Sequence, residues 1–308
     1  MAGDSSADGT AVYCPAMPQI AAPPVLPLPP VRLPAPDADG FVPYEEVNPD
    51  GAAPFVLLCD HASNAVPAPY GTLGLAPEQL ERHIGWDIGA ADVTRALAGM
   101  LDAPAVLSGF SRLLIDPNRG ADDPTLVMKL SDGAIVPSNR HADAAEVDAR
   151  RRGYWQPYQD AIAARIDARL RSGPPPAIVS LHSFTPVWRR RVRPWHAGIL
   201  WDRDPRLPLA LLGLLRREPG LVVGDNEPYS GRLRNDTMYR HGTGRGLPHA
   251  LVEIRQDLID TRHGAAEWAA LLARVLREAA GGDGFHAIRH YGSHTDDTQQ
   301  RIDPEDRG

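Results

Sequence analysis

Two histidines each follow a run of apolar residues, a position where catalytic side chains gather in α/β proteins. Residues 55–59 lead through Asp60 to His61, and residues 177–181 lead to His182. The first run is uninterrupted, and the second is broken only by the small residue Ser180. Apolar runs of this length are typical of strands buried on both faces. Ligands of an open α/β sheet bind just beyond the carboxyl ends of such strands. The pattern therefore favours a metal ion or a reacting group here, although a histidine that only caps its strand would give the same pattern.

Charged side chains stand at two further predicted strand ends. The segment 111–119 has an apolar centre and ends in Asp116-Pro-Asn-Arg119, and Glu253 lies near the end of the run 249–254. Two histidines with one carboxylate leave a coordination position open for water, which is the ligand pattern of catalytic zinc. A further carboxylate near that water can act as a general base. The groups are spread over separate segments, unlike the compact His-Glu-x-x-His motif.

Strands and helices alternate along the chain, which predicts an α/β fold with a mixed, largely parallel sheet and helices on both faces. Helix 77–101 would carry Asp87 beside an apolar stripe, and Pro157 would kink or split helix 143–171. Residues 120–142 are predicted to form a long loop. The other predicted helices are 205–217 and 264–281, and the predicted strands are 55–59, 103–108, 112–116, 177–182, 196–201, 220–224 and 249–254.

Composition limits the class of protein. The 308 residues are 43% hydrophobic and 23% charged, as in globular proteins. The formal net charge of −7 argues against a general nucleic-acid binder, because such proteins usually carry a basic excess. We expect no disulfide between Cys14 and Cys59, since Cys59 lies in a buried strand. No apolar run approaches the ~18 residues that span a bilayer, and no signal peptide is evident, so we expect a cytoplasmic protein without a membrane partner.

The chain divides into three parts by composition. Residues 1–45 are rich in proline and small residues and are predicted to form a flexible N-terminal arm. Residues 46–284 form the folded domain, and the polar residues 285–308 are predicted to form a frayed C-terminal tail. Within the domain, the basic stretch 188–195 is interpreted either as a pocket rim that attracts an anionic substrate or as a solvated loop.

Over residues 50–275 the chain resembles the N-formylglutamate amidohydrolase family, which is related to the zinc carboxypeptidase and aspartoacylase group. This resemblance implies that residues 46–284 are an amidohydrolase-like catalytic domain with a zinc carboxypeptidase-like (phosphorylase/hydrolase-like) fold. It also implies a zinc-dependent deacylase that cleaves an amide on the nitrogen of an acidic amino acid. The motifs that carry the resemblance are Asp60-His61-Ala-Ser-Asn64, Asp87, Ser-Arg112-Leu-Leu-Ile-Asp116-Pro-Asn118-Arg119, Leu-His182-Ser-Phe and Val-Glu253-Ile-Arg-Gln-Asp257.

By this resemblance, His61 and His182 match the two metal-binding histidines. The wider group often supplies the third ligand as a glutamate in a His-x-x-Glu motif, and that position here is Asn64, a poor anionic ligand. Asp87 is the replacement that we expect to complete a site for one zinc ion per chain. An alternative role for Asp87 is that of an outer partner for a histidine N–H group.

The resemblance also assigns the groups that handle the substrate. Glu253 matches the general base, which takes a proton from water and passes it to the leaving amine; a salt bridge to Arg255 or another basic residue is the alternative. Arg112 is expected to stabilise the oxyanion. Asn118 and Arg119 offer a planar, forked set of donors to the α-carboxylate. Asp116 is expected to orient Arg119 or a loop.

These features predict hydrolysis of an N-acyl, preferably N-formyl, acidic amino acid such as N-formyl-L-glutamate, with release of formate, in amino-acid catabolism. The expected partners are this small anionic substrate and zinc. Two alternatives stay open. One is another zinc amidase or carboxypeptidase-like enzyme that acts on a different acyl amino acid or a peptide, and the other is a metal-free module for anionic ligands. The sequence does not indicate an oligomeric state.

Overall fold

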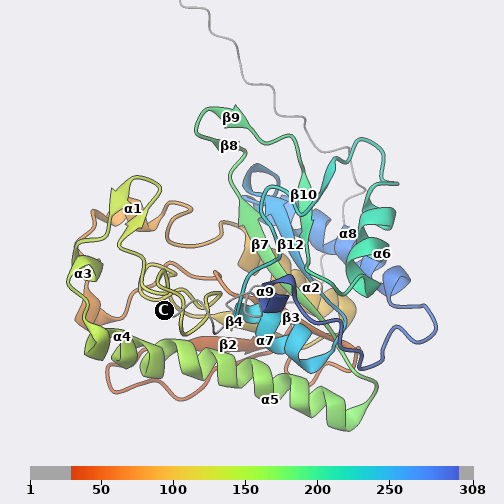
Figure 1. Ribbon diagram of the computed structural model, residues 1–308, viewed down its shortest axis with the longest axis horizontal. Helices are drawn as coiled ribbons and strands as arrows, with labels where there is room; N and C mark the ends of the chain where they lie inside the picture. The colour runs from red at the N-terminus through yellow and green to blue at the C-terminus, as the bar shows by residue number, and fades with distance from the viewer. Residues whose placement is uncertain (1–28, 298–308) are drawn as a thin grey trace, which may run out of the picture.

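A mixed sheet of eight strands forms the centre of the computed structural model, which describes residues 29–297 (Figure 1). The strand order is β1-β2-β4-β3-β7-β12-β10-β11. The four central strands β4, β3, β7 and β12 run parallel, whereas β2 and β10 run antiparallel to their inner neighbours. The strands are β1 (Val31–Arg32), β2 (Tyr44–Val47), β3 (Phe55–Cys59), β4 (Ala105–Ser108), β7 (Ala177–Phe184), β10 (Ala197–Leu200), β11 (Val223–Asp225) and β12 (His249–Arg255).

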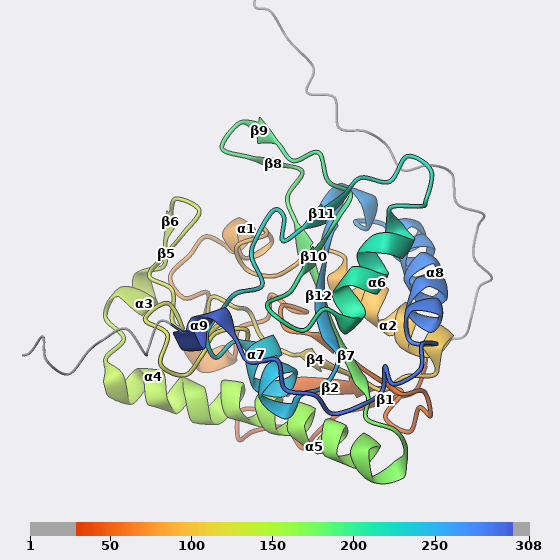
Figure 2. The ribbon, with the colours of Figure 1, turned by 45° about the vertical axis from the view of Figure 1, so that its right-hand side comes forward.

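Helices cover both faces of this sheet (Figure 2). Helices α2 (Ala90–Leu101), α6 (Arg206–Leu215) and α8 (Arg262–Ala279) share one hydrophobic core with one face, and α5 (Gln156–Ser172) packs against the other face. Alternate strand residues serve the two cores, as Leu57 and Leu58 do. The other elements are α1 (Pro77–Leu80), α3 (Pro137–Arg140), α4 (Ala144–Arg150), α7 (Thr237–His241), α9 (His294–Asp297), the hairpins β5 (Leu130–Ser131)–β6 (Ala134–Ile135) and β8 (Val187–Trp188)–β9 (Arg191–Val192), and the short turns η1 (Ala68–Tyr70), η2 (Arg151–Trp155), η3 (Thr243–Arg245) and η4 (Gln256–Leu258).

The predicted strands 55–59, 177–182 and 249–254 are confirmed as β3, β7 and β12. All residues of β3, β7 and β12 are buried, because helices cover both faces of these strands. The predicted helix 143–171 is also present as α4, η2 and α5. A π-helical turn, η2, interrupts it just before Pro157.

The predicted single helix 77–101 is wrong over residues 81–89, which form turns between α1 and α2. Gly89 has a φ of 81°, in the left-handed region that a helix does not use. The proposed stripe also divides, because Ile84 belongs to one core and Ala91 to the other. Asp87 therefore lies in a loop before α2 rather than on a helix.

The predicted strand 112–116 is also wrong. The Leu114 amide donates to the Ser111 carbonyl (2.9 Å) and the Arg119 amide to the Asp116 carbonyl (3.1 Å), as in successive turns. The central residues Leu113, Leu114 and Ile115 are nevertheless fully buried. The long loop predicted at 120–142 contains the β5–β6 hairpin and α3.

Of the predicted N-terminal arm, residues 1–28 lie outside the described part of the chain, as does Cys14, whereas residues 29–45 contribute β1 and the start of β2. In the C-terminal segment, residues 298–308 lie outside as well. The Arg289 amide donates to the Gly246 carbonyl (2.8 Å) and the His294 amide to Asp202 (3.1 Å), so residues 289–294 are tied to the domain. No helix within residues 29–297 has the length and apolar character needed to cross a membrane.

We expect Gly89→Ala to destabilise the fold. A Cβ atom there would lie 2.2 Å from the Ile259 carbonyl oxygen, and the φ of 81° strains any other residue. Backbone strain alone predicts a loss of about 1–3 kcal/mol in the free energy of unfolding, measured by chemical denaturation. Gly213→Ala, at an exposed and open position of α6, is the matched control and should be neutral or stabilising. Equal effects of the two substitutions would contradict the argument.

Candidate metal centre and catalytic pocket

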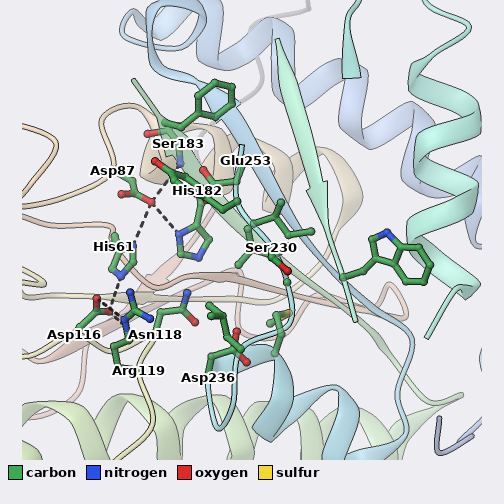
Figure 3. A pocket seen from close by; sticks show the side chains of 18 of the residues that line it. His61, Asp87, Asp116, Asn118, Arg119, His182, Ser183, Ser230, Asp236 and Glu253 are labelled. Atoms are coloured by element: carbon green, nitrogen blue, oxygen red, sulfur yellow. Dashed lines mark hydrogen bonds and ion pairs between the residues drawn. The ribbon is translucent and has the colours of Figure 1, made fainter. Parts of the chain in front are cut away.

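One cavity of about 390 Å³ opens at the carboxyl ends of β3, β7 and β12 (Figure 3). This is the edge at which the strand-end histidines were expected. The structure brings all seven predicted site residues to the walls of this cavity. They are His61, Asp87, Arg112, Asn118, Arg119, His182 and Glu253.

Three of these side chains form a compact cluster. Asp87 Oδ2 lies 3.3 Å from His61 Nδ1 and 2.9 Å from His182 Nδ1, and the Ser183 amide donates to the same oxygen (3.3 Å). One ligand atom from each of His61, Asp87 and His182 lies within 4.8 Å of the other two, and all three residues are buried. Figure 3 shows the Asp87 carboxylate pointing between the two imidazole rings. This arrangement can hold a metal ion with two nitrogen ligands and one oxygen ligand.

The outer nitrogen of each histidine faces another buried carboxylate. His61 Nε2 lies 2.7 Å from Asp116 Oδ1, and His182 Nε2 lies 3.1 Å from Asp60 Oδ2. A proton on Nε2 would be donated to that carboxylate, which leaves the Nδ1 lone pair free for a metal. Such outer carboxylates are typical of metal-binding histidines, because they fix the tautomer and the orientation of the ring.

Asp60 has four side-chain donors. Tyr158 of α5 and Thr237 of α7 donate to Oδ1 (3.1 and 2.7 Å), while Ser180 and His182 of β7 donate to Oδ2 (2.8 and 3.1 Å). Burial raises the pKa of Asp60, but the hydrogen bond and the charge of His182 outweigh burial and hold this pKa below its usual value. No role for Asp60 was predicted from the sequence. Its place directly before His61 was the available signal.

Arg112 bridges two of the carboxylates. Its guanidinium lies 3.4 Å from Asp87 Oδ1 and 3.1 Å from Asp116 Oδ2. Burial raises the pKa of Asp116, whereas Arg112 and then His61 lower it, with a net decrease. Asp116 therefore serves as a shared partner of His61 and Arg112, a larger role than the expected orientation of Arg119. The contacts of Arg119 with Asp116 and Asp123 are long, at 3.8 and 3.9 Å.

Glu253 differs from Asp60, Asp87 and Asp116, whose pKa values are all lowered. It is paired in register with His182 across β7 and β12, and its Oε2 atom is buried without a hydrogen-bond partner within the described chain. The largest influence on its pKa is burial, which raises it. The charge of His182 lowers this pKa and the charge of Asp87 raises it, and the resulting pKa is about 7. The expected salt-bridge alternative is not formed with Arg255, which pairs with Asp257 instead (2.7 Å). A carboxyl with a pKa near neutrality suits proton transfer.

Asp236 is a wall residue that was not predicted from the sequence. Asp236 caps α7 by accepting the Tyr239 amide (2.7 Å), and burial raises its pKa to about 7. Tyr229 and Ser230 reach the cavity from a loop between β11 and α7. Asn64, the position that departs from the wider group's motif, is not among the residues that line the cavity.

The fold and the pocket define a class of protein, a hydrolase-type α/β domain with a candidate metal centre at its sheet edge. Residues 53–260 match the N-formylglutamate amidohydrolase family, and the chain belongs to this family, which makes it an amidohydrolase by class. No curated protein matches its sequence.

The solved structures that are similar to the chain include the following two. The gene product Atu2144 from Agrobacterium tumefaciens is 34% identical, with a TM-score of 0.75, over 79% of this chain and 96% of its own. An N-formylglutamate amidohydrolase from Ralstonia eutropha JMP134 is 24% identical, with a TM-score of 0.60, over 77% of this chain and 97% of its own; it supports the fold.

We expect His61→Ala and Asp87→Ala each to abolish zinc binding, because each removes one of three closely spaced ligand atoms. Asn64→Ala, outside the cavity wall, is the control and should keep about one zinc per chain. Elemental analysis of the purified variants measures this, with circular dichroism to verify folding. Zinc retained by a folded Asp87→Ala variant would place the third ligand elsewhere.

Proposed function

We propose that the protein is a zinc-dependent amidohydrolase that cleaves the amide of an N-acyl, preferably N-formyl, acidic amino acid such as N-formyl-L-glutamate. The observation that carries this proposal is the position of Glu253. A buried carboxyl oxygen without a partner in the described chain stands beside the cluster of His61, Asp87 and His182. Family membership supports the reaction class.

The cluster fits zinc by the chemistry of its donors. Two imidazole nitrogens and one carboxylate oxygen form a common ligand set of catalytic zinc sites, with one position left open. Asp116 and Asp60 hold the outer nitrogens of the two histidines, as expected for metal ligands. When bound, zinc would supply a Lewis acid that polarises the amide carbonyl and lowers the pKa of water.

Other residues of the chain transfer the proton, stabilise the oxyanion and bind the substrate. Glu253 takes a proton from the attacking water and returns it to the leaving amine nitrogen, for which its pKa near 7 is suited. Arg112, held in place by Asp87 and Asp116, offers a fixed positive charge to the developing oxyanion. Arg119 and Asn118 bind the α-carboxylate, since the long ion pairs of Arg119 leave its N–H groups for a ligand.

The direct test is formate release from N-formyl-L-glutamate by the zinc-supplied protein. We expect turnover that a chelator abolishes and added zinc restores, because the ligand cluster requires its ion. N-acetyl-L-glutamate and N-succinyl-L-glutamate, assayed in parallel, report on the acyl group. Binding of these compounds without hydrolysis of any of them would contradict the proposal and favour a binding module.

We expect Glu253→Gln to lower kcat by roughly 10²- to 10⁴-fold, the usual contribution of a general base. The amide keeps the size of the side chain but cannot accept the proton from water. Zinc content should be unchanged, because Glu253 is not one of the three ligands. Wild-type turnover in this variant would remove Glu253 from the mechanism.

A further inference from the structure

Arg193 is a buried arginine beside the pocket, and it has no role in the proposed reaction mechanism. It follows β9 and is only 8% exposed. Its Nη1 atom donates to the main-chain and side-chain oxygens of Thr185 (3.3 and 3.2 Å). Three aromatic rings surround its guanidinium, with ring centres 5.7, 5.4 and 5.0 Å away for Phe184, Trp188 and Tyr229.

Within residues 29–297, Arg193 has no carboxylate partner, unlike the other two buried arginines. Arg150 pairs with Glu146 and Arg255 with Asp257, both at 2.7 Å. A buried charge is costly unless an opposite charge or a full set of hydrogen bonds compensates it. Aromatic rings offset part of this cost but accept few of the five N–H groups of a guanidinium. The charge of Arg193 is therefore only partly compensated within the described chain, and its surroundings suit the binding of an anion.

The position of Arg193 relates it to the candidate metal centre. Phe184, which it covers, lies two residues beyond His182 on the same face of β7, about 7 Å further along the strand. Phe184, Thr185 and Tyr229 all line the cavity. In Figure 3, Ser183, which precedes Phe184 at the carboxyl end of β7, and the pair Asn118–Arg119 lie on opposite sides of the His182 imidazole.

We propose that the part of the cavity wall formed by Thr185 and Tyr229, with Arg193 packed against both, binds the side-chain carboxylate of an N-acyl acidic amino acid. This inference rests on the proposed function and adds the determinant of side-chain specificity. Arg119 and Asn118 hold the α-carboxylate at one end, and the Arg193 guanidinium attracts the second carboxylate at the other. The scissile amide then lies between them, beside His61, Asp87 and Glu253. Charge-assisted hydrogen bonds to a guanidinium are stronger than those between neutral groups.

A purely structural role for Arg193 predicts a different result. If the guanidinium only fixes the β8–β9 hairpin to Tyr229, its loss weakens all ligands alike. If it binds the second carboxylate, its loss weakens only ligands that carry one. A comparison of L-glutamate with L-glutamine separates the two roles, because these ligands differ only in that charge.

The experiment measures calorimetric binding of L-glutamate and L-glutamine to the zinc-supplied protein, and kcat/KM for their N-formyl derivatives. We expect the wild type to prefer the glutamate form. Arg193→Gln should lower this preference roughly 10- to 100-fold, the value of a charge-assisted hydrogen bond. Arg193→Lys should keep part of the preference. Arg191→Gln, which removes an exposed charge from the same hairpin, should keep all of it.

Each outcome decides a separate question. Equal binding of glutamate and glutamine by the wild type, or an unchanged preference in Arg193→Gln, would overturn the assignment of Arg193. A preference that depends on Arg193 without hydrolysis of either N-formyl compound would support the assignment but contradict the proposed function. If Arg193→Gln does not fold, the wild-type preference and the Arg193→Lys variant still decide.

Discussion

The compensation of buried charge organises this molecule. Asp60, Asp87 and Asp116 are almost completely buried, at 0%, 4% and 0% exposure, and each must find donors inside the protein. The two histidines and Arg112 supply those donors, together with hydroxyl groups from α5, β7 and α7. Removal of one member would leave an uncompensated charge, which is more damaging than loss of the pair. The network therefore fixes several elements around the cavity at once.

The sequence predicted the parts of the fold in which local pattern and tertiary environment agree. Residues 55–59 are all apolar, and residues 177–181 are apolar except for Ser180, because helices cover both faces of these strands. The position of each strand end could therefore be predicted directly from the end of the apolar run. Residues 113–115 have the same pattern without being a strand. Their carbonyl groups are satisfied by side chains from distant segments: Asn139 donates to Leu113, and Arg150 donates to Leu114. Those partners lie 26 and 36 residues away, so no local pattern could distinguish this segment from a buried strand.

The site was predictable by residue type but not by contact. His61, His182 and Glu253 were found because strands end at one edge of a sheet, a rule of topology. Asp87 was predicted to lie on a helix, but it lies in the loop before α2, and this position allows its carboxylate to reach both histidines. The partnership of Asp60 with His182 spans 122 residues and has no spacing that sequence can reveal. The distinction between a paired and an unpaired buried arginine likewise requires the structure.

The contrast between Glu253 and the three aspartates follows from one physical argument. A carboxylate that accepts several hydrogen bonds from cationic groups has a low pKa and cannot exchange protons near neutrality. Asp60 and Asp116 are in this state, and their function is to orient other groups. Glu253 is also buried, at 6% exposure, but it has an oxygen without a donor in the described chain, so burial dominates and its pKa rises to about 7. The site thus combines Asp60 and Asp116, whose low pKa keeps them as anions that orient other groups, with Glu253, whose pKa near neutrality allows proton transfer. The difference between these carboxyl groups is the number of donors that each receives.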